Sequence, residues 1–127
     1  MLNIDIAKLE KSVADLQALL RDGLLATDIW DPATGLSLAG INPQPAATAL
    51  FNVLTTDIGT TLVNSGFPPL NRYYLLDLGN NNAVVILKHG EDLLQGILLD
   101  SRKANMGILF SVALPKALDA VQKARVA

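Results

Sequence analysis

The sequence predicts an α+β domain in which a five-stranded antiparallel sheet carries helices on both faces. Residues 72–100 contain three apolar runs, 72–78, 83–88 and 93–99, separated by short polar turns. Runs this short, bounded by Gly, Asn and Asp clusters, are typical of a β-meander. Two further strands and three helical stretches give the order helix, two strands, helix, three strands, helix. A chain of 127 residues suits a single domain, spanning 1–127.

Residues 4–22 are predicted to form the first helix. Its apolar residues recur every three or four positions and form one stripe: Ile6, Leu9, Val13, Leu16 and Leu20. Either Asn3 or Asp5 can cap the start of this helix. Gly23 is expected to be the left-handed residue that ends it.

The next two strands are predicted over residues 24–31 and 36–41, joined by Asp31-Pro32-Ala33-Thr34-Gly35. Pro32 presets φ for a turn and Gly35 tolerates a positive φ, so this segment is predicted to be a hairpin loop. Apolar residues point to both sides of each strand. That pattern favours a sheet that is covered on both faces.

A second helix is predicted over residues 46–64. Its expected inward stripe comprises Ala47, Leu50 or Phe51, Leu54, Ile58 and Leu62, and its opposite side is small and Thr-rich, with Ala49, Thr56, Gly59 and Thr60. A glycine inside a helix costs on the order of 1 kcal/mol relative to alanine. Close approach of another backbone is one reason to place Gly59 there.

The last helix is predicted to end near Val126, and Pro115 interrupts it. A proline inside a helix removes one hydrogen bond and clashes with the preceding turn. Either the helix is kinked near Ser111, or it starts near Leu114 with Pro115 in its first turn. The favoured expectation is a kinked helix that starts near Asn105.

Composition limits the classes of partner. Half of the residues are apolar and the mean hydropathy is +0.35, which favours a homo-oligomer because a small monomer has difficulty covering so much apolar surface. A net charge of −2 without a basic stripe argues against nucleic acid. No apolar run is judged to approach the roughly 20 residues that span a bilayer, so no membrane insertion is expected. Acidic residues near the N-terminus argue against a signal peptide, and a cytoplasmic location is expected.

No constellation of catalytic side chains stands out, so the chain is not expected to be an enzyme. His89 is the one histidine and falls in a turn, where its ring is expected to meet water without a nucleophile nearby. Asp28 and Asp31 are expected on opposite faces of a strand. With no His or Cys cluster and no phosphate loop, neither a metal nor a cofactor is predicted. Arg72 could act as an arginine finger, but a solvated arginine at a strand start is the favoured interpretation.

Several local motifs, in this order of elements, resemble the roadblock family. They are Asp31-Pro32-Ala33-Thr34-Gly35-Leu36, the long helix after Asn42-Pro43, and Gly96-Ile97-Leu98-Leu99-Asp100 followed by Asn105-Met106-Gly107-Ile108-Leu109. That family includes roadblock-type dynein light chains and bacterial gliding-motility GTPase partners. The resemblance covers about residues 4–125 and implies a single roadblock-like domain of profilin-like fold. Pro115 departs from the family's uninterrupted last helix.

The resemblance also implies a homodimer. In the family, the third strands of two subunits pair antiparallel and the second helices pack across the axis. The implied interface here comprises Arg72, Tyr73, Tyr74, Leu75, Leu76 and Leu78 of the strand with Thr56, Gly59 and Thr60 of the helix. Family members commonly bind Ras-like small GTPases and act by presenting a surface.

The implied function is therefore a non-enzymatic homodimeric regulator or scaffold of a Ras-like small GTPase. The alternative is a sensory module of the PAS or profilin-like type that holds a small apolar molecule. The leucine-rich core and the lone Trp30 near a strand end are the features that favour this alternative.

Overall fold

The strands and helices follow the predicted order closely in the computed structural model, which describes residues 2–126. They are α1 Ile6–Leu20, β1 Leu24–Asp31, β2 Leu36–Ile41, α2 Pro45–Asn64, β3 Tyr73–Leu78, β4 Asn82–His89, β5 Leu93–Asp100, α3 Met106–Ile108 and α4 Leu114–Ala124. The bounds of β1 and β2 agree with the prediction residue for residue. Strands β4 and β5 are each slightly longer than predicted.

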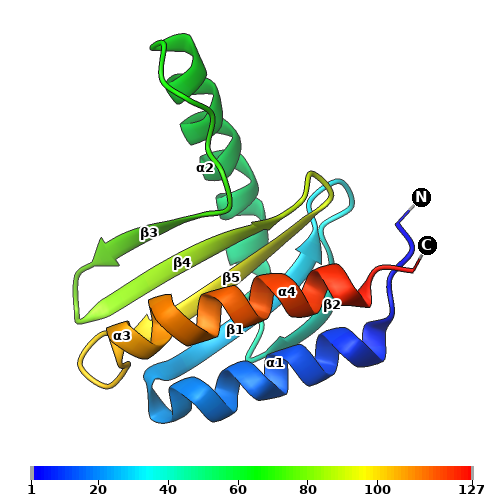
Figure 1. Cartoon of the computed structure of the whole chain (residues 1–127). Helices are drawn as coiled ribbons and strands as arrows, with labels where there is room; N and C mark the ends of the chain where they lie inside the picture. Colours follow the sequence, from blue (N-terminus) through cyan, green and yellow to red (C-terminus); the bar gives the residue numbers. More distant parts are fainter. Residues whose placement is uncertain (1, 127) are drawn as a thin grey trace.

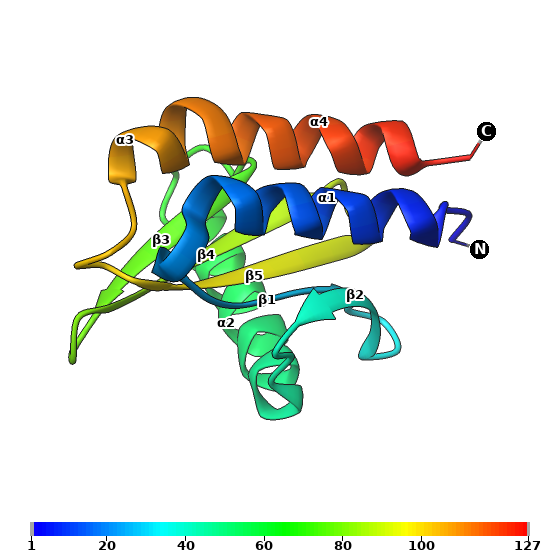
Figure 2. The same ribbon diagram turned by 90° about the horizontal axis from the view of Figure 1, so that it is seen from below.

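The five strands form one antiparallel sheet in the order β2-β1-β5-β4-β3. Strands β2 and β3 are therefore its two edges. Helices α1, α3 and α4 lie on one face and α2 lies on the other (Figures 1 and 2). The predicted α+β class, with helices on both faces of a five-stranded sheet, is confirmed. The β1–β2 ladder shifts register between Ile29 and Trp30, as at a β-bulge.

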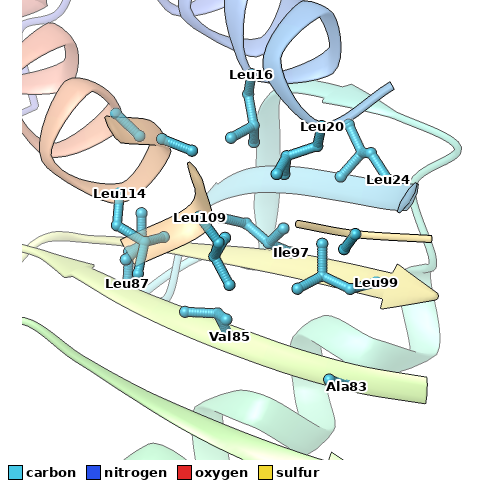
Figure 3. Close-up of a cluster of buried hydrophobic side chains, with 13 residues drawn as sticks. Leu16, Leu20, Leu24, Ala83, Val85, Leu87, Ile97, Leu99, Leu109 and Leu114 are labelled. Atoms are coloured by element: carbon cyan, nitrogen blue, oxygen red, sulfur yellow. The ribbon is translucent and has the colours of Figure 1, made fainter. Parts of the chain in front are cut away.

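The main core lies between the sheet and the helices α1 and α4 (Figure 3). Leucines from α1, from α4 and from the turn before α4 meet the inward side chains of three strands: Leu16, Leu20, Leu109 and Leu114 pack with Leu24, Val85, Leu87, Ile97 and Leu99. These residues are all at least nine-tenths buried. Burial of this apolar surface fixes the sheet against the two helices.

Helix α1 buries four of the five predicted stripe residues, while Ile6 remains 39% exposed. The expectation for Ile6 was wrong because Leu2 and Ile4, which precede the helix, pack against the core there. Asp5 is the N-cap, since its Oδ1 accepts a hydrogen bond from the backbone N–H of Lys8 at 3.3 Å.

The C-terminal end of α1 also differs from the prediction. Arg21 ends the helix with a φ of 53°, so the positive φ that was expected of Gly23 occurs two residues earlier. Gly23 is instead required by packing, because a Cβ at that position would lie 2.5 Å from the Cα of Ala104. Closer than 3 Å to a backbone atom, such a side chain would force the chain to move.

The β1–β2 hairpin follows its predicted turn chemistry. Gly35 adopts a φ of 75°, which a residue with a side chain rarely does. The Asp31 Oδ1 atom accepts a hydrogen bond from the N–H of Ala33 at 2.9 Å and holds the turn.

The last helix starts at Met106, with Asn105 as its N-cap at 3.0 Å from the N–H of Ile108. A π-helical turn over Leu109–Ala113 follows, and Pro115 lies in the first turn of α4. The wider turn separates the proline from the preceding α-helical turn. The predicted interruption near Ser111 therefore takes the form of a π-turn.

Candidate functional site

Strand β3 pairs with β4 on one side, and no strand of the described chain pairs with its other side. The N–H of Lys88 donates to the carbonyl of Arg72 at 2.7 Å. In an antiparallel ladder, the backbone groups of alternate residues point to the same side. The N–H and C=O groups of Tyr73, Leu75 and Asp77 therefore point to the free edge.

The two tyrosines of β3 lie on opposite faces of the sheet. The hydroxyl of Tyr74 is 2.8 Å from Thr55 Oγ1 of α2. The ring of Tyr73 lies on the other face, with its centroid 6.3 Å from that of Phe110. Because neighbouring side chains of a strand alternate in direction, each tyrosine links the edge strand to a different helix.

The other predicted strand residues have mixed environments. Leu75 packs partly against the main core, and Leu76 is half-buried. Leu78, at the end of the strand, is 44% exposed. Arg72 is exposed just before β3, as the interpretation of a solvated arginine expects. The edge thus offers both backbone groups and apolar side chains.

Helix α2 has no buried residue. Thr56 and Thr60 of the predicted interface are exposed. A Cβ built on Gly59 meets no atom within 4 Å. No neighbour within residues 2–126 therefore accounts for a glycine at this position of the helix.

The N-terminal half of α2 is fixed to the sheet by hydrogen bonds. Trp30 Nε1 donates to Asn52 Oδ1 at 2.8 Å, and Asn52 Nδ2 donates to the carbonyl of Pro32 at 3.3 Å. Together with the bond between Thr55 and Tyr74, these contacts hold the helix across one face of the sheet. The C-terminal half extends past the edge strand β3 into solvent (Figure 1).

Large apolar side chains cover the exposed side of this helix and the segment after it. Their exposed fractions lie between 56 and 65% for Leu50, Val53, Val63 and Phe67. The prediction that Leu50 or Phe51 points inward is met by Phe51, which packs against the small core cluster around Trp30. Val53, Val63 and Phe67 were missed. They lie outside the predicted stripe, so the helical periodicity did not indicate them.

Helix α2 is also long and apolar enough to cross a membrane, judged by length and composition alone. The expectation that no apolar run approaches this length was therefore wrong. Its 20 residues include one charged side chain, Asp57. One helix of this kind is weak evidence for a membrane span, since the hydrogen bonds of Asn52 and Thr55 attach it to the sheet.

A small groove lies between the start of α2 and the sheet. It has a volume of about 90 Å³ and is lined mainly by apolar atoms, with Trp30 and Phe51 among its larger side chains. Pockets for small-molecule ligands usually measure roughly 300–1,000 Å³. The groove therefore has room for one small ring.

His89 was expected in a turn facing water, and this expectation was wrong. It is the last residue of β4 and is 4% exposed. Its Nε2 lies 2.8 Å from Gln95 Oε1. Burial lowers the pKa of His89 to about 4, and the Arg125 guanidinium acts in the same direction.

The carboxylates of the first hairpin have structural partners. Asp28 is buried and accepts a hydrogen bond from Ser37 Oγ, while burial raises the pKa of its carboxyl group. Asp31 caps the hairpin turn. Among residues 2–126, no group of three or more His, Cys, Asp or Glu side chains is placed to hold a metal ion.

The chain was compared with known proteins. No protein-family model matches the sequence, and no curated protein matches it. Among solved structures, it is similar to MglB from Myxococcus xanthus, with a TM-score of 0.79 and 13% identity over 97% of this chain and 91% of that one. It is similar to a Roadblock/LC7 domain from Streptomyces avermitilis, with a TM-score of 0.65 and 11% identity over 90% and 94% of the two chains.

A third similar structure is profilin from Schizosaccharomyces pombe, with a TM-score of 0.56 and 9% identity over 92% of this chain and 93% of that one. At these identities the similarity concerns the fold. The chain has the roadblock and profilin-like fold, so the resemblance inferred from the sequence is confirmed at the level of structure.

Proposed function

We propose that this chain is a homodimeric, non-catalytic regulator or scaffold of a Ras-like small GTPase, acting in the cytoplasm. The observation that carries the proposal is the surface formed by the unpaired edge of β3 and the uncovered outer half of α2. It combines free backbone groups with exposed apolar side chains at one edge of the molecule. In a roadblock-like fold, this is the surface to which the sequence resemblance assigns the homodimer.

Pairing of two β3 strands satisfies the outward backbone groups of Tyr73, Leu75 and Asp77. Antiparallel pairing about a two-fold axis perpendicular to the sheet keeps each side chain on its own face. The numbers of two paired residues must then be both odd or both even. At the axis, either Leu75 faces Leu75 of the second copy or Leu76 faces Leu76. Either register gives one continuous ten-stranded sheet.

The same two-fold axis gives α2 a place to pack. Its outer half extends past β3 (Figure 1), so in the dimer it would lie over the sheet of the second copy. Val63 of this outer half, which is 56% exposed, is then available to cover apolar surface instead of facing water. A second α2 crossing near Gly59 would account for the absence of a side chain there.

The dimer is tested with Asp77→Pro and its matched control Asp77→Ala. Proline at this position removes an N–H that points to the free edge and leaves the ladder with β4 intact. By sedimentation velocity, Asp77→Pro is expected to raise the dimer dissociation constant by roughly tenfold or more, whereas Asp77→Ala stays close to the wild type. A monomeric wild-type protein, or a dimer insensitive to the proline, would contradict the strand-paired dimer.

The GTPase partner is tested separately. A Ras-like GTPase encoded beside this gene is the first candidate, measured for affinity and for GTP hydrolysis with and without the chain. Binding with a changed rate supports regulation, and binding without a changed rate supports a scaffold. Absence of both binding and a rate effect would refute the GTPase role and leave the dimer as a separate result.

The ligand-binding alternative rests on the groove beside Trp30 and Phe51. Because its volume is about 90 Å³, below the range of usual ligand pockets, GTPase regulation remains the proposal. Native mass spectrometry discriminates the two, since a bound small molecule of constant mass would favour the sensory module.

A further inference from the structure

An open groove lies between the C-terminal end of α1 and the start of the last helix, on the sheet face opposite α2 (Figures 1 and 2). Its volume is about 710 Å³, within the roughly 300–1,000 Å³ that ligand sites usually measure. The apolar part of its lining includes Leu19, which is half-buried, and Ile108, which is 36% exposed. The groove therefore has room for several groups of another molecule.

Two cationic side chains line this groove from opposite sides of it. Arg21 follows the last residue of α1, and Lys103 lies in the loop before α3. Both are exposed, and within residues 2–126 neither forms an ion pair. Asp22 is the one acidic residue of the lining, so the groove is net positive on a chain whose net charge is −2. That charge favours an anionic ligand.

The backbone of Arg21 has a conformation that disfavours a residue with a side chain. Its φ is 53° and its ψ is −129°, which lies outside the small left-handed region that such residues can reach. Every other positive φ within residues 2–126 belongs to an asparagine or a glycine: Asn42, Asn80, Asn81, Gly35, Gly66 and Gly90. Asparagine and glycine tolerate a positive φ. Arg21 is the exception, and its conformation is strained.

The short connection from α1 to β1 constrains the backbone at Arg21. Three residues join the helix to the strand, and Gly23 among them packs against the backbone of Ala104. Glycine at position 21 would follow the same path with less strain. An arginine there costs the fold stability, and residues strained in this way cluster at binding sites. Its guanidinium has no partner within the described residues that would account for it.

We propose that this groove binds an acidic segment of a partner protein. Carboxylates of the segment pair with Arg21 and Lys103, since an arginine can hold a carboxylate with two hydrogen bonds. An apolar side chain of the segment covers Leu19 and Ile108. A simple anion would use the two cations and leave the apolar lining exposed, so a segment that carries both kinds of group fits better. The site involves neither β3 nor α2, and it does not depend on the proposed dimer.

The probe is a synthetic fluorescein-labelled peptide in which two leucines are flanked by glutamates, and fluorescence anisotropy measures its binding. Arg21→Gly and Lys103→Ala are each expected to raise the dissociation constant about tenfold. The matched control is Lys8→Ala, which removes an exposed cation at the other end of α1 and is expected to stay within about twofold of the wild type. A peptide with lysines in place of the glutamates is expected not to bind.

Thermal unfolding separates a role in binding from a role in the fold. Arg21→Gly is expected to raise the midpoint by about 2–5 °C, because glycine relieves the strain, whereas Arg21→Ala keeps the Cβ and is expected not to raise it. Weaker binding together with a more stable fold is typical of a residue that is retained for function. A lower midpoint for Arg21→Gly would show that the guanidinium stabilises the C-terminal end of α1. Weaker binding would then reflect damage to the fold, and the proposal would be overturned.

The remaining outcomes also decide the proposal. Equal affinity of the acidic peptide for the wild type, Arg21→Gly and Lys103→Ala would place its binding outside the groove and overturn the inference. Inorganic phosphate and vesicles containing phosphatidylserine are titrated in parallel, and binding of either one without the peptide would assign the cations to a different ligand. Absence of binding by the peptide overturns the inference as well. None of these results bears on the strand-paired dimer, which Asp77→Pro tests separately.

Discussion

The ring of His89 belongs to a chain of buried hydrogen bonds. Gln95 Nε2 donates to Thr27 Oγ1 at 3.1 Å, and Thr27 donates to the carbonyl of Gly96 at 2.7 Å. This direction fixes the Gln95 amide oxygen as the acceptor for His89, so His89 Nε2 carries the proton. A neutral ring with its proton on Nε2 satisfies the chain without burying a charge.

Stability is expected to fall in mild acid because of His89. The pKa of the ring is 6.5 in an exposed state and about 4 in the fold, so the unfolded chain binds a proton first. The contribution of His89 is complete above pH 6.5 and is lost as the pH falls to 4. Urea denaturation is expected to show a loss of about 2 kcal/mol at pH 5 and about 3 kcal/mol at pH 4.

The matched variant is His89→Gln, whose amide still donates a hydrogen bond but does not titrate. Its unfolding free energy is expected to be nearly flat between pH 7 and pH 5. Asp92 and Asp100 have lowered pKa values, so their effects lie below this window, and Asp28, with a raised pKa, acts in the opposite direction. Equal slopes for the wild type and the variant would show that His89 is not responsible.

At the scale of secondary-structure elements, a few side-chain hydrogen bonds attach α2 to the rest of the chain. Asn52→Ala removes the acceptor of the Trp30 indole N–H, which is buried with its ring. The expected cost is about 1–3 kcal/mol of unfolding free energy, since a buried donor is left without a partner. Fluorescence of the single tryptophan is expected to shift to the red. Asn64→Ala, at the exposed end of the same helix, serves as the control and is expected to change stability by less than about 0.5 kcal/mol.

Substitution of Gly59 is expected to affect the monomer and the dimer in opposite directions. Gly59→Ala is expected to stabilise an Asp77→Pro monomer by on the order of 1 kcal/mol, because alanine favours helix and a Cβ has free space there. In the wild-type background, the same substitution is expected to weaken the dimer if two helices cross closely at this point. Sedimentation velocity measures the second effect, with Thr61→Ala as the control. A dimer tightened by Gly59→Ala would rule out a close crossing.

Elements with local signals were the ones that the sequence predicted well. Strands β1 and β2 are bounded by Pro32 and Gly35 in a turn whose geometry those residues determine, so their limits were found. The predicted stripe of α2 is its half-buried side, whereas the exposed Val53 and Val63 lie outside that stripe and were not predicted. His89 was misplaced because β4 runs one residue past the predicted Lys88. That extra residue pairs with Leu93 and turns the ring inward.

Part of the candidate site could be predicted because strand β3 also has local signals in the sequence. Strand β3 could be located from its flanking turns, and the structure places it at a sheet edge. The interface predicted on this strand remains a prediction. The contact between the rings of Tyr73 and Phe110 could not be located from the sequence. It depends on the π-turn and on the packing of that turn beside β3, and both are set by tertiary contacts.

At the scale of the whole molecule, stability should depend on protein concentration. Association of folded chains draws the equilibrium toward the folded state by mass action. The midpoint of thermal unfolding is therefore expected to rise with concentration for the wild type and for Asp77→Ala. For Asp77→Pro it is expected to remain constant. A wild-type midpoint that is independent of concentration over a hundredfold range would argue against the dimer.

The register shift between Ile29 and Trp30 has a consequence for growth of the assembly. If β3 edges are used in pairing, the ten-stranded sheet ends on both sides in β2, a strand of six residues beside a bulge. A bulge twists an edge and makes it a poor template for another strand. In the proposed dimer the sheet would therefore stop at two chains, and the same feature that shapes the first hairpin would oppose further strand pairing into fibres.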